Sequence, residues 1–132
     1  MKTFVLRLQP HQDLRAELEA FAQANSLKAA FILTCVGSLR RAALRLANQE
    51  DTTYYEDKFE ILSLVGTLST DGPHLHIALS DGTGKTIGGH VQEGNLIYTT
   101  AEIIIGELDN LVFTRPIDPE TTYDELTISE RS

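Results

Sequence analysis

Three of the four histidines of the chain lie in one short segment whose pattern is typical of a β-hairpin. His74, His76 and His90 flank the sequence Asp81-Gly-Thr-Gly-Lys85, in which two glycines free to adopt positive φ favour a chain reversal. Side chains of a strand alternate between its two faces, so His74 and His76 share one face. If the turn is centred on Thr83, His76 lies directly opposite His90 and His74 lies diagonal to it. All three imidazoles then occupy one face, with Cβ atoms within about 5 to 8 Å of one another.

This spacing predicts a metal site. Imidazole is the commonest protein ligand for borderline metals, and three histidines with an open fourth position are typical of catalytic zinc sites. We therefore expect His74, His76 and His90 to bind Zn²⁺ or another divalent transition metal, with water or a carboxylate in the fourth position. Two alternatives remain open: a hydrogen-bonded polar cluster at a subunit interface, or a one-residue shift of the turn that sends His90 to the opposite face.

A zinc enzyme is one function that such a site would allow. Zinc lowers the pKa of bound water toward about 7, although no residue indicates a substrate. Other catalytic motifs are incomplete or absent in the sequence. Gly84-Lys85-Thr86 resembles the end of a phosphate-binding loop, but Leu79 stands where its first glycine is required. No Gly-x-Ser-x-Gly or Cys-x-x-Cys motif occurs, so a serine hydrolase or a zinc finger has no support.

Composition limits the class of protein. With 132 residues, 42% of them hydrophobic, the chain can bury one core and is expected to be a single domain over residues 1–132. It has no apolar run long enough to cross a bilayer and no signal-peptide core, so we expect a soluble cytoplasmic protein without membrane partners. The single cysteine, Cys35, excludes an intramolecular disulfide, and its apolar neighbours predict a buried residue rather than a nucleophile.

Charge argues against unassisted binding to nucleic acid. The net charge is −8, whereas such binding depends on lysine and arginine at phosphates. The one basic cluster contains Arg40, Arg41 and Arg45, and we interpret it as a pocket lining or an interface.

The remaining pattern predicts the elements that position these residues. Residues 13–25 have helical periodicity, with Asp13 as N-cap and Asn25 as stop. Their apolar face consists of Leu14, Leu18, Phe21 and Ala22. Strands are expected over residues 3–9, 29–35, 42–47, 59–68, 75–79, 86–91, 96–107 and 111–113. The result is an α+β domain, a mostly antiparallel and strongly curved sheet with one helix packed on it, followed by a polar, acidic tail at 116–132 whose Tyr123 and Leu126 dock onto the body.

Six motifs occur in order along the chain. They are Gly37-Ser-Leu-Arg-Arg-Ala-Ala-Leu44, Phe59-Glu-Ile-Leu-Ser-Leu-Val-Gly66, His74-Leu-His76, Gly88-Gly-His90 with Gly94, Thr99-Thr-Ala-Glu102, and Phe113-x-Arg115-x-x-Asp118 with Tyr123-Asp-Glu-Leu126. Together they resemble the plant-and-prokaryote-conserved (PPC) domain. The resemblance implies a trimer with the histidine-rich strands facing a cleft near the subunit interface. It also carries over a set of matching residues: Arg41, Glu60, His74, His76, His90, Glu102 and Arg115. Of these, Glu102 is the candidate carboxylate for the fourth metal position and the candidate general base of a zinc enzyme.

The resemblance further shapes the expected function. In land plants the domain follows an AT-hook and serves protein–protein association, and stand-alone bacterial members are often described as DNA-binding. This chain has no AT-hook, and Asp57-Lys58 stands where plant members have glycine-arginine. We therefore expect an assembly or regulatory module that forms homotrimers and has possible protein partners, with DNA binding and a zinc enzyme as alternatives. Arg41, Glu60 and Arg115 are candidates for ligand binding, although Glu60 and Glu102 are equally consistent with solvated or ion-paired strand residues.

Overall fold

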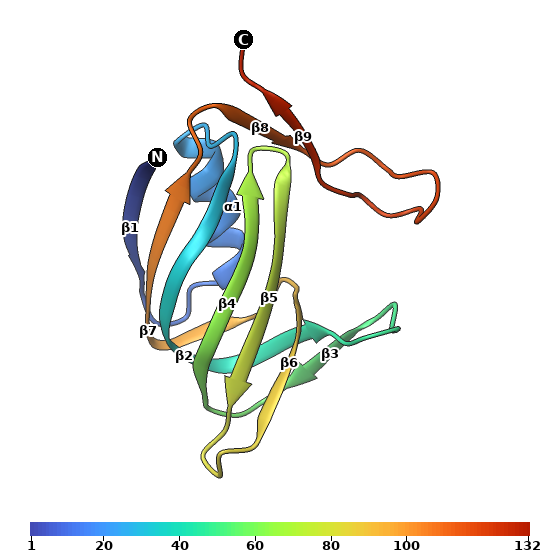
Figure 1. The fold of residues 1–132 in the computed structure, drawn as a ribbon. Coiled ribbons are helices and arrows are strands. Elements are labelled where there is room, and N and C mark those ends of the chain that lie inside the picture. The colour runs from blue at the N-terminus through green and yellow to red at the C-terminus, as the bar shows by residue number, and fades with distance from the viewer.

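The computed structural model describes residues 1–132 and contains one helix and nine strands (Figure 1). In chain order these are β1 (Lys2–Leu8), α1 (Leu14–Ala24), β2 (Ala30–Arg45), β3 (Thr52–Tyr55), β4 (Phe59–Ser69), β5 (Gly72–Ser80), β6 (Thr86–Val91), β7 (Leu96–Glu107), β8 (Leu111–Thr114) and β9 (Thr127–Glu130). The helix is too short and too polar to cross a membrane.

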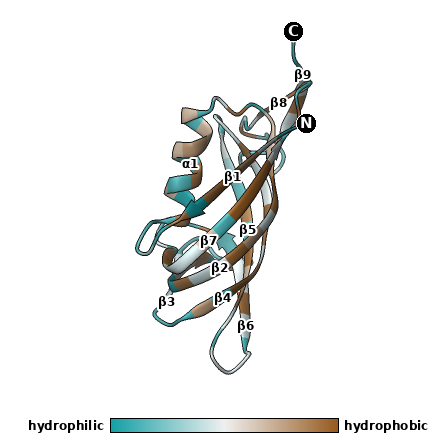
Figure 2. Cartoon of the chain, turned by 90° about the vertical axis from the view of Figure 1, so that its left-hand side faces the viewer, coloured by the Kyte–Doolittle hydropathy of each residue, from teal (hydrophilic) through white to brown (hydrophobic).

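The strands form a curved antiparallel sheet that partly closes on itself. The order is β1-β7-β2-β4-β5-β6, with β3 beside β2, and β2 also pairs with β6 through Leu44 and Val91. Strands β2, β4, β5 and β6 therefore close into a ring whose interior holds buried residues such as Leu44, Ile77 and Val91. Helix α1 lies on one side of the sheet (Figure 2). The expected α+β architecture with one helix is confirmed.

Helix α1 begins and ends where its sequence signals predict. The Asp13 carboxylate accepts a hydrogen bond from the backbone N–H of Ala16 at 3.0 Å, which satisfies a free donor of the first turn. Leu14 and Leu18 are fully buried as expected. Phe21 is only half-buried and makes an edge-to-face contact with Phe4, with ring centroids 5.5 Å apart. Phe21 therefore packs against the core as part of the apolar helix face, but from a half-buried position at its rim.

Strand β2 corrects a second expectation. A single strand of 16 residues, Ala30–Arg45, replaces the two strands expected over 29–35 and 42–47. Gly37 lies between the two expected strands but is inside β2, where a Cβ atom would meet the Thr100 carbonyl oxygen at 2.1 Å. The glycine therefore permits close approach of β7 and does not reverse the chain. Because β2 is continuous, it carries Arg45 to the edge where β6 ends.

The C-terminal residues contain an unexpected hairpin. Strand β9 pairs with β8 in a separate two-stranded sheet, and Arg131 Nη2 lies 3.3 Å from a carboxylate oxygen of the buried Glu107. The loop between these strands extends away from the sheet (Figure 1). Of the two residues expected to dock, Tyr123 contacts the Arg45 guanidinium with its ring, and Leu126 is 38% exposed. Strand β3 was also not expected from the sequence.

Candidate metal centre

The β5–β6 hairpin sets the register of the histidines. The Asp81 carboxylate accepts hydrogen bonds from the backbone N–H groups of Thr83 at 2.8 Å and Lys85 at 3.1 Å. Gly84 has a φ of 86°, which favours glycine. This turn pairs His76 directly with His90, as the sequence predicts.

Strand β2 adds a charged neighbour on the same face. Arg45 pairs with His90 on β6, so that Arg45, His90 and His76 form a row across three strands. The row lies on the outer face of the ring, since the residues that alternate with it are buried. Gly89 allows the close packing of β6 on β2, because a Cβ atom there would lie 2.9 Å from the Arg45 carbonyl oxygen.

The histidine nitrogens have a spacing that suits a tetrahedral metal. His76 Nε2 and His90 Nδ1 lie 3.2 Å apart. Two nitrogens bound to one tetrahedral ion at 2.0 to 2.1 Å are separated by about 3.3 Å. One ligand nitrogen from each of the three histidines lies within 4.8 Å of the others. The ligand nitrogen of His74 therefore has to move by at most about 1.5 Å to complete the set.

The surroundings keep two of these imidazoles neutral. Burial, with the nearby Arg45 charge as the next cause, lowers the pKa of His90 from 6.5 to about 4. Burial and then Arg115 lower the pKa of His74 below its usual value. Neutral imidazole is the form that ligates a metal, so both side chains have a lone pair available near pH 7.

Without a metal, the cluster is held by hydrogen bonds. The 3.2 Å contact requires one of His76 and His90 to donate its N–H to the other, and Arg115 Nη2 donates to His74 Nδ1 at 3.4 Å. A coordinated nitrogen carries no proton, so a metal would replace the bond between the two histidines.

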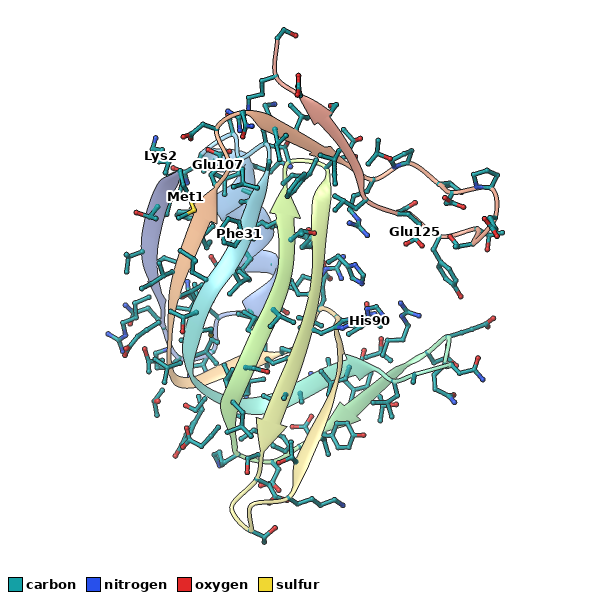
Figure 3. All side chains as sticks on the ribbon, in the orientation of Figure 1. Met1, Lys2, Phe31, His90, Glu107 and Glu125 are labelled. Carbon is teal, nitrogen blue, oxygen red and sulfur yellow. The ribbon has the colours of Figure 1, made fainter.

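The histidines form the floor of a cavity of about 950 Å³. Its walls come from Arg15 on α1, from residues 48–51 between β2 and β3, and from the loop between β8 and β9. Figure 3 shows His90 facing the space between the β2–β3 hairpin and the loop that bears Glu125. Arg115 anchors this loop, because its Nη2 donates to the Asp124 carbonyl oxygen at 3.0 Å.

Of the remaining residues carried over by the family resemblance, only Arg115 lines this cavity. Arg41 lies over the Tyr54 ring and forms a 3.0 Å ion pair with Glu56. Glu60 is exposed on β4, and Glu102 is exposed on β7 between β1 and β2. Within one chain, therefore, Glu102 is not positioned as a fourth ligand or as a general base at the histidines. The expected basic cluster also divides, since Arg45 faces the cavity while Arg41 pairs with Glu56.

The sequence-based expectations missed several cavity residues. Arg45 was assigned to a pocket or an interface, but Arg15, Gln92 and residues 48–51 carried no signal that linked them to the histidines. Their positions depend on how the helix and two loops pack, and no local pattern encodes that packing.

The chain is similar to proteins from bacteria, archaea and plants. Residues 1–109 match the Plants and Prokaryotes Conserved (PCC) domain. The chain is 48% identical over 130 residues to the bifunctional protein GlmU of a Synechococcus strain, covering 98% of this chain and 21% of that protein. It is 30% identical over 112 residues to AT-hook motif nuclear-localized protein 8 of Arabidopsis thaliana, covering 77% of this chain and 28% of that protein. The chain thus spans about a fifth of the length of its cyanobacterial relatives.

Solved structures agree with this relationship. A hypothetical protein from Salmonella cholerae-suis is 47% identical, with a TM-score of 0.96 over 99% of this chain and 95% of the other. A metal-containing protein from Archaeoglobus fulgidus is 27% identical, with a TM-score of 0.80 over 96% of this chain and 94% of the other. From its sequence and its fold, the chain belongs to the Plants and Prokaryotes Conserved (PCC) domain family.

Proposed function

We propose that this domain is a homotrimeric module whose three histidines bind one divalent transition metal per chain, and that this metal is Zn²⁺. It would act in assembly or regulation. The observation that carries the metal proposal is the 3.2 Å separation of His76 Nε2 and His90 Nδ1, with a third histidine beside them. That separation is close to the spacing of about 3.3 Å that two ligands of a tetrahedral zinc require.

Two further observations support the choice of metal. Three imidazoles and one open position match the donor set of many zinc sites, whereas calcium and magnesium prefer oxygen ligands. The similar protein from Archaeoglobus fulgidus is described as metal-containing. These points favour a borderline transition metal over a hard cation.

The outer face of the sheet supports the proposed self-association. Four large apolar side chains on this face are 55% to 75% exposed: Val5, Val36, Leu62 and Val65. Exposed apolar groups that share one face are typical of an interface between chains. The strand register places Glu60 and Glu102 on the same face. We therefore assign these two residues to the contact between chains.

The relatives support a modular role. In the cyanobacterial GlmU proteins a segment similar to this chain makes up about a fifth of a longer protein, and in the plant relative it makes up 28%. A domain that occurs in such different contexts suits association better than one fixed reaction.

Direct binding to duplex DNA is the weaker candidate. The plant relatives are named for an AT-hook, but this chain contains none and has a net charge of −8. We expect no salt-dependent binding to a DNA duplex in fluorescence anisotropy at low salt.

Equilibrium dialysis against Zn²⁺, followed by elemental analysis of protein without a histidine tag, tests the proposal. We expect one zinc per chain, and loss of that zinc in His90→Ala. His11→Asn is the matched control, because His11 lies outside the cavity and asparagine tolerates its φ of 76°. Zinc retained at full stoichiometry by His90→Ala would contradict the site.

A further inference from the structure

Two arginines beside the histidines have no carboxylate partner. The structure contains four ion pairs, and none involves Arg45 or Arg115, although both line the cavity. Arg15, the third arginine of the cavity, is paired with Glu19 at 2.7 Å. The chain has a net charge of −8, so two cations without ion-pair partners beside the three histidines indicate a site for an anion.

The two guanidinium groups approach the histidine floor from different elements. Arg45 pairs in register with His90 on the neighbouring strand. Arg115 follows β8 and reaches His74 with Nη2, which is 3.4 Å from Nδ1. The Nε and Nη1 atoms of Arg115 form no hydrogen bond within the chain. Part of the guanidinium group is therefore free to bind an oxyanion.

Carboxylates also line the cavity, but they do not neutralise Arg45 and Arg115 through ion pairs. Glu50, Asp51, Asp124 and Glu125 line the cavity, but none lies within ion-pair distance of an arginine nitrogen. The guanidinium groups of Arg45 and Arg115 are therefore available to a negative group beside the histidines.

We infer that the open coordination position of the proposed metal takes an oxyanion, a carboxylate or phosphate group of a small polar ligand, held by Arg45 and Arg115. This inference rests on the proposed metal site, because the metal supplies the charge that makes the oxyanion a fourth ligand. Only one of the 15 residues that line the cavity is hydrophobic, which suits a hydrophilic ligand.

Cobalt(II) in place of zinc provides a direct readout. The visible absorption of protein-bound Co²⁺ changes when a ligand enters its coordination shell. Metal-loaded protein is titrated with inorganic phosphate and separately with acetate, at constant ionic strength. We expect saturable spectral changes, and the tighter of the two anions identifies the class of oxyanion.

Arginine variants distinguish the contribution of Arg45 and Arg115 to anion binding from that of the metal. Arg45→Gln and Arg115→Gln are each expected to weaken anion binding about tenfold or more, since a charge-assisted hydrogen bond is lost, while still binding Co²⁺. Lys85→Gln removes one positive charge from the exposed tip of the same hairpin and should leave anion binding unchanged. Thermal unfolding of each variant confirms that it is folded.

The outcomes distinguish the two proposals. Failure to bind Co²⁺ overturns the metal site itself. Binding of Co²⁺ with a spectrum that neither anion changes overturns the oxyanion inference alone. Anion binding that both arginine variants retain at full strength overturns the assignment of Arg45 and Arg115.

Discussion

Replacement of His76 by alanine gives a quantitative prediction. His76 provides the nitrogen that lies 3.2 Å from His90 Nδ1, so its loss removes one member of the best-spaced ligand pair. The two remaining rings, those of His74 and His90, are stacked with centroids 5.2 Å apart. We expect the affinity for zinc to fall by at least about 100-fold, because the loss of a residue that only hydrogen-bonds to a metal ligand already costs about 10- to 100-fold.

The expected magnitude follows from linkage between binding and folding. Free zinc at 100 times its Kd stabilises the folded state by about 2.7 kcal/mol, which for a domain of this size raises Tm by roughly 8 °C. At the same zinc concentration, a variant with 100-fold weaker binding gains only about 0.4 kcal/mol, or roughly 1 °C. Because His76 is exposed, the metal-free Tm should change little.

Differential scanning calorimetry with and without zinc, at one protein concentration, measures both values. His11→Asn is the control and should keep the full zinc-induced shift. If His76→Ala shows the same increase in Tm with zinc as the unmodified protein, the ligand assignment is refuted.

Three further predictions concern pH, assembly and packing. The pKa of His90 in the folded state is about 4, below its ordinary value of 6.5, so the unfolded chain binds more protons between these two pH values. The metal-free protein should therefore lose stability as the pH falls from 6.5 to 4. Urea unfolding at pH 7 and pH 4.5 tests this prediction, and equal midpoints would contradict it. Val36→Asp places a charge on the exposed apolar face and should yield a 14.6 kDa monomer by light scattering, unless that face is not the contact between chains. Phe21→Ala should cost about 1 to 2 kcal/mol, less than the roughly 3 to 5 kcal/mol of a fully buried phenylalanine, and urea unfolding distinguishes the two values.

The hairpin that bears the histidines could be predicted because its signals are local. Strand alternation and the turn at Asp81–Lys85 together determine that His76 faces His90. The helix was predictable for the same reason, since its cap residues and its apolar face lie within the segment itself. Such features depend on neighbours a few residues away in the chain.

The rest of the site depends on contacts between distant segments. Two separate strands were expected on either side of Gly37, and only the close approach of β7 shows why glycine is needed inside a continuous β2. That continuity places Arg45 beside His90. Glu102 was associated with the histidines on the basis of residue type and family resemblance alone, and its strand register places it elsewhere on the sheet. No periodic pattern shows which loop will form a cavity wall.

X-ray absorption spectroscopy of zinc-loaded protein without a histidine tag tests the central claim most directly. The account predicts about three imidazole nitrogens at 2.0 to 2.1 Å from zinc and one further light-atom ligand. Zinc bound without the scattering pattern of imidazole, or no zinc retained at all, would contradict it.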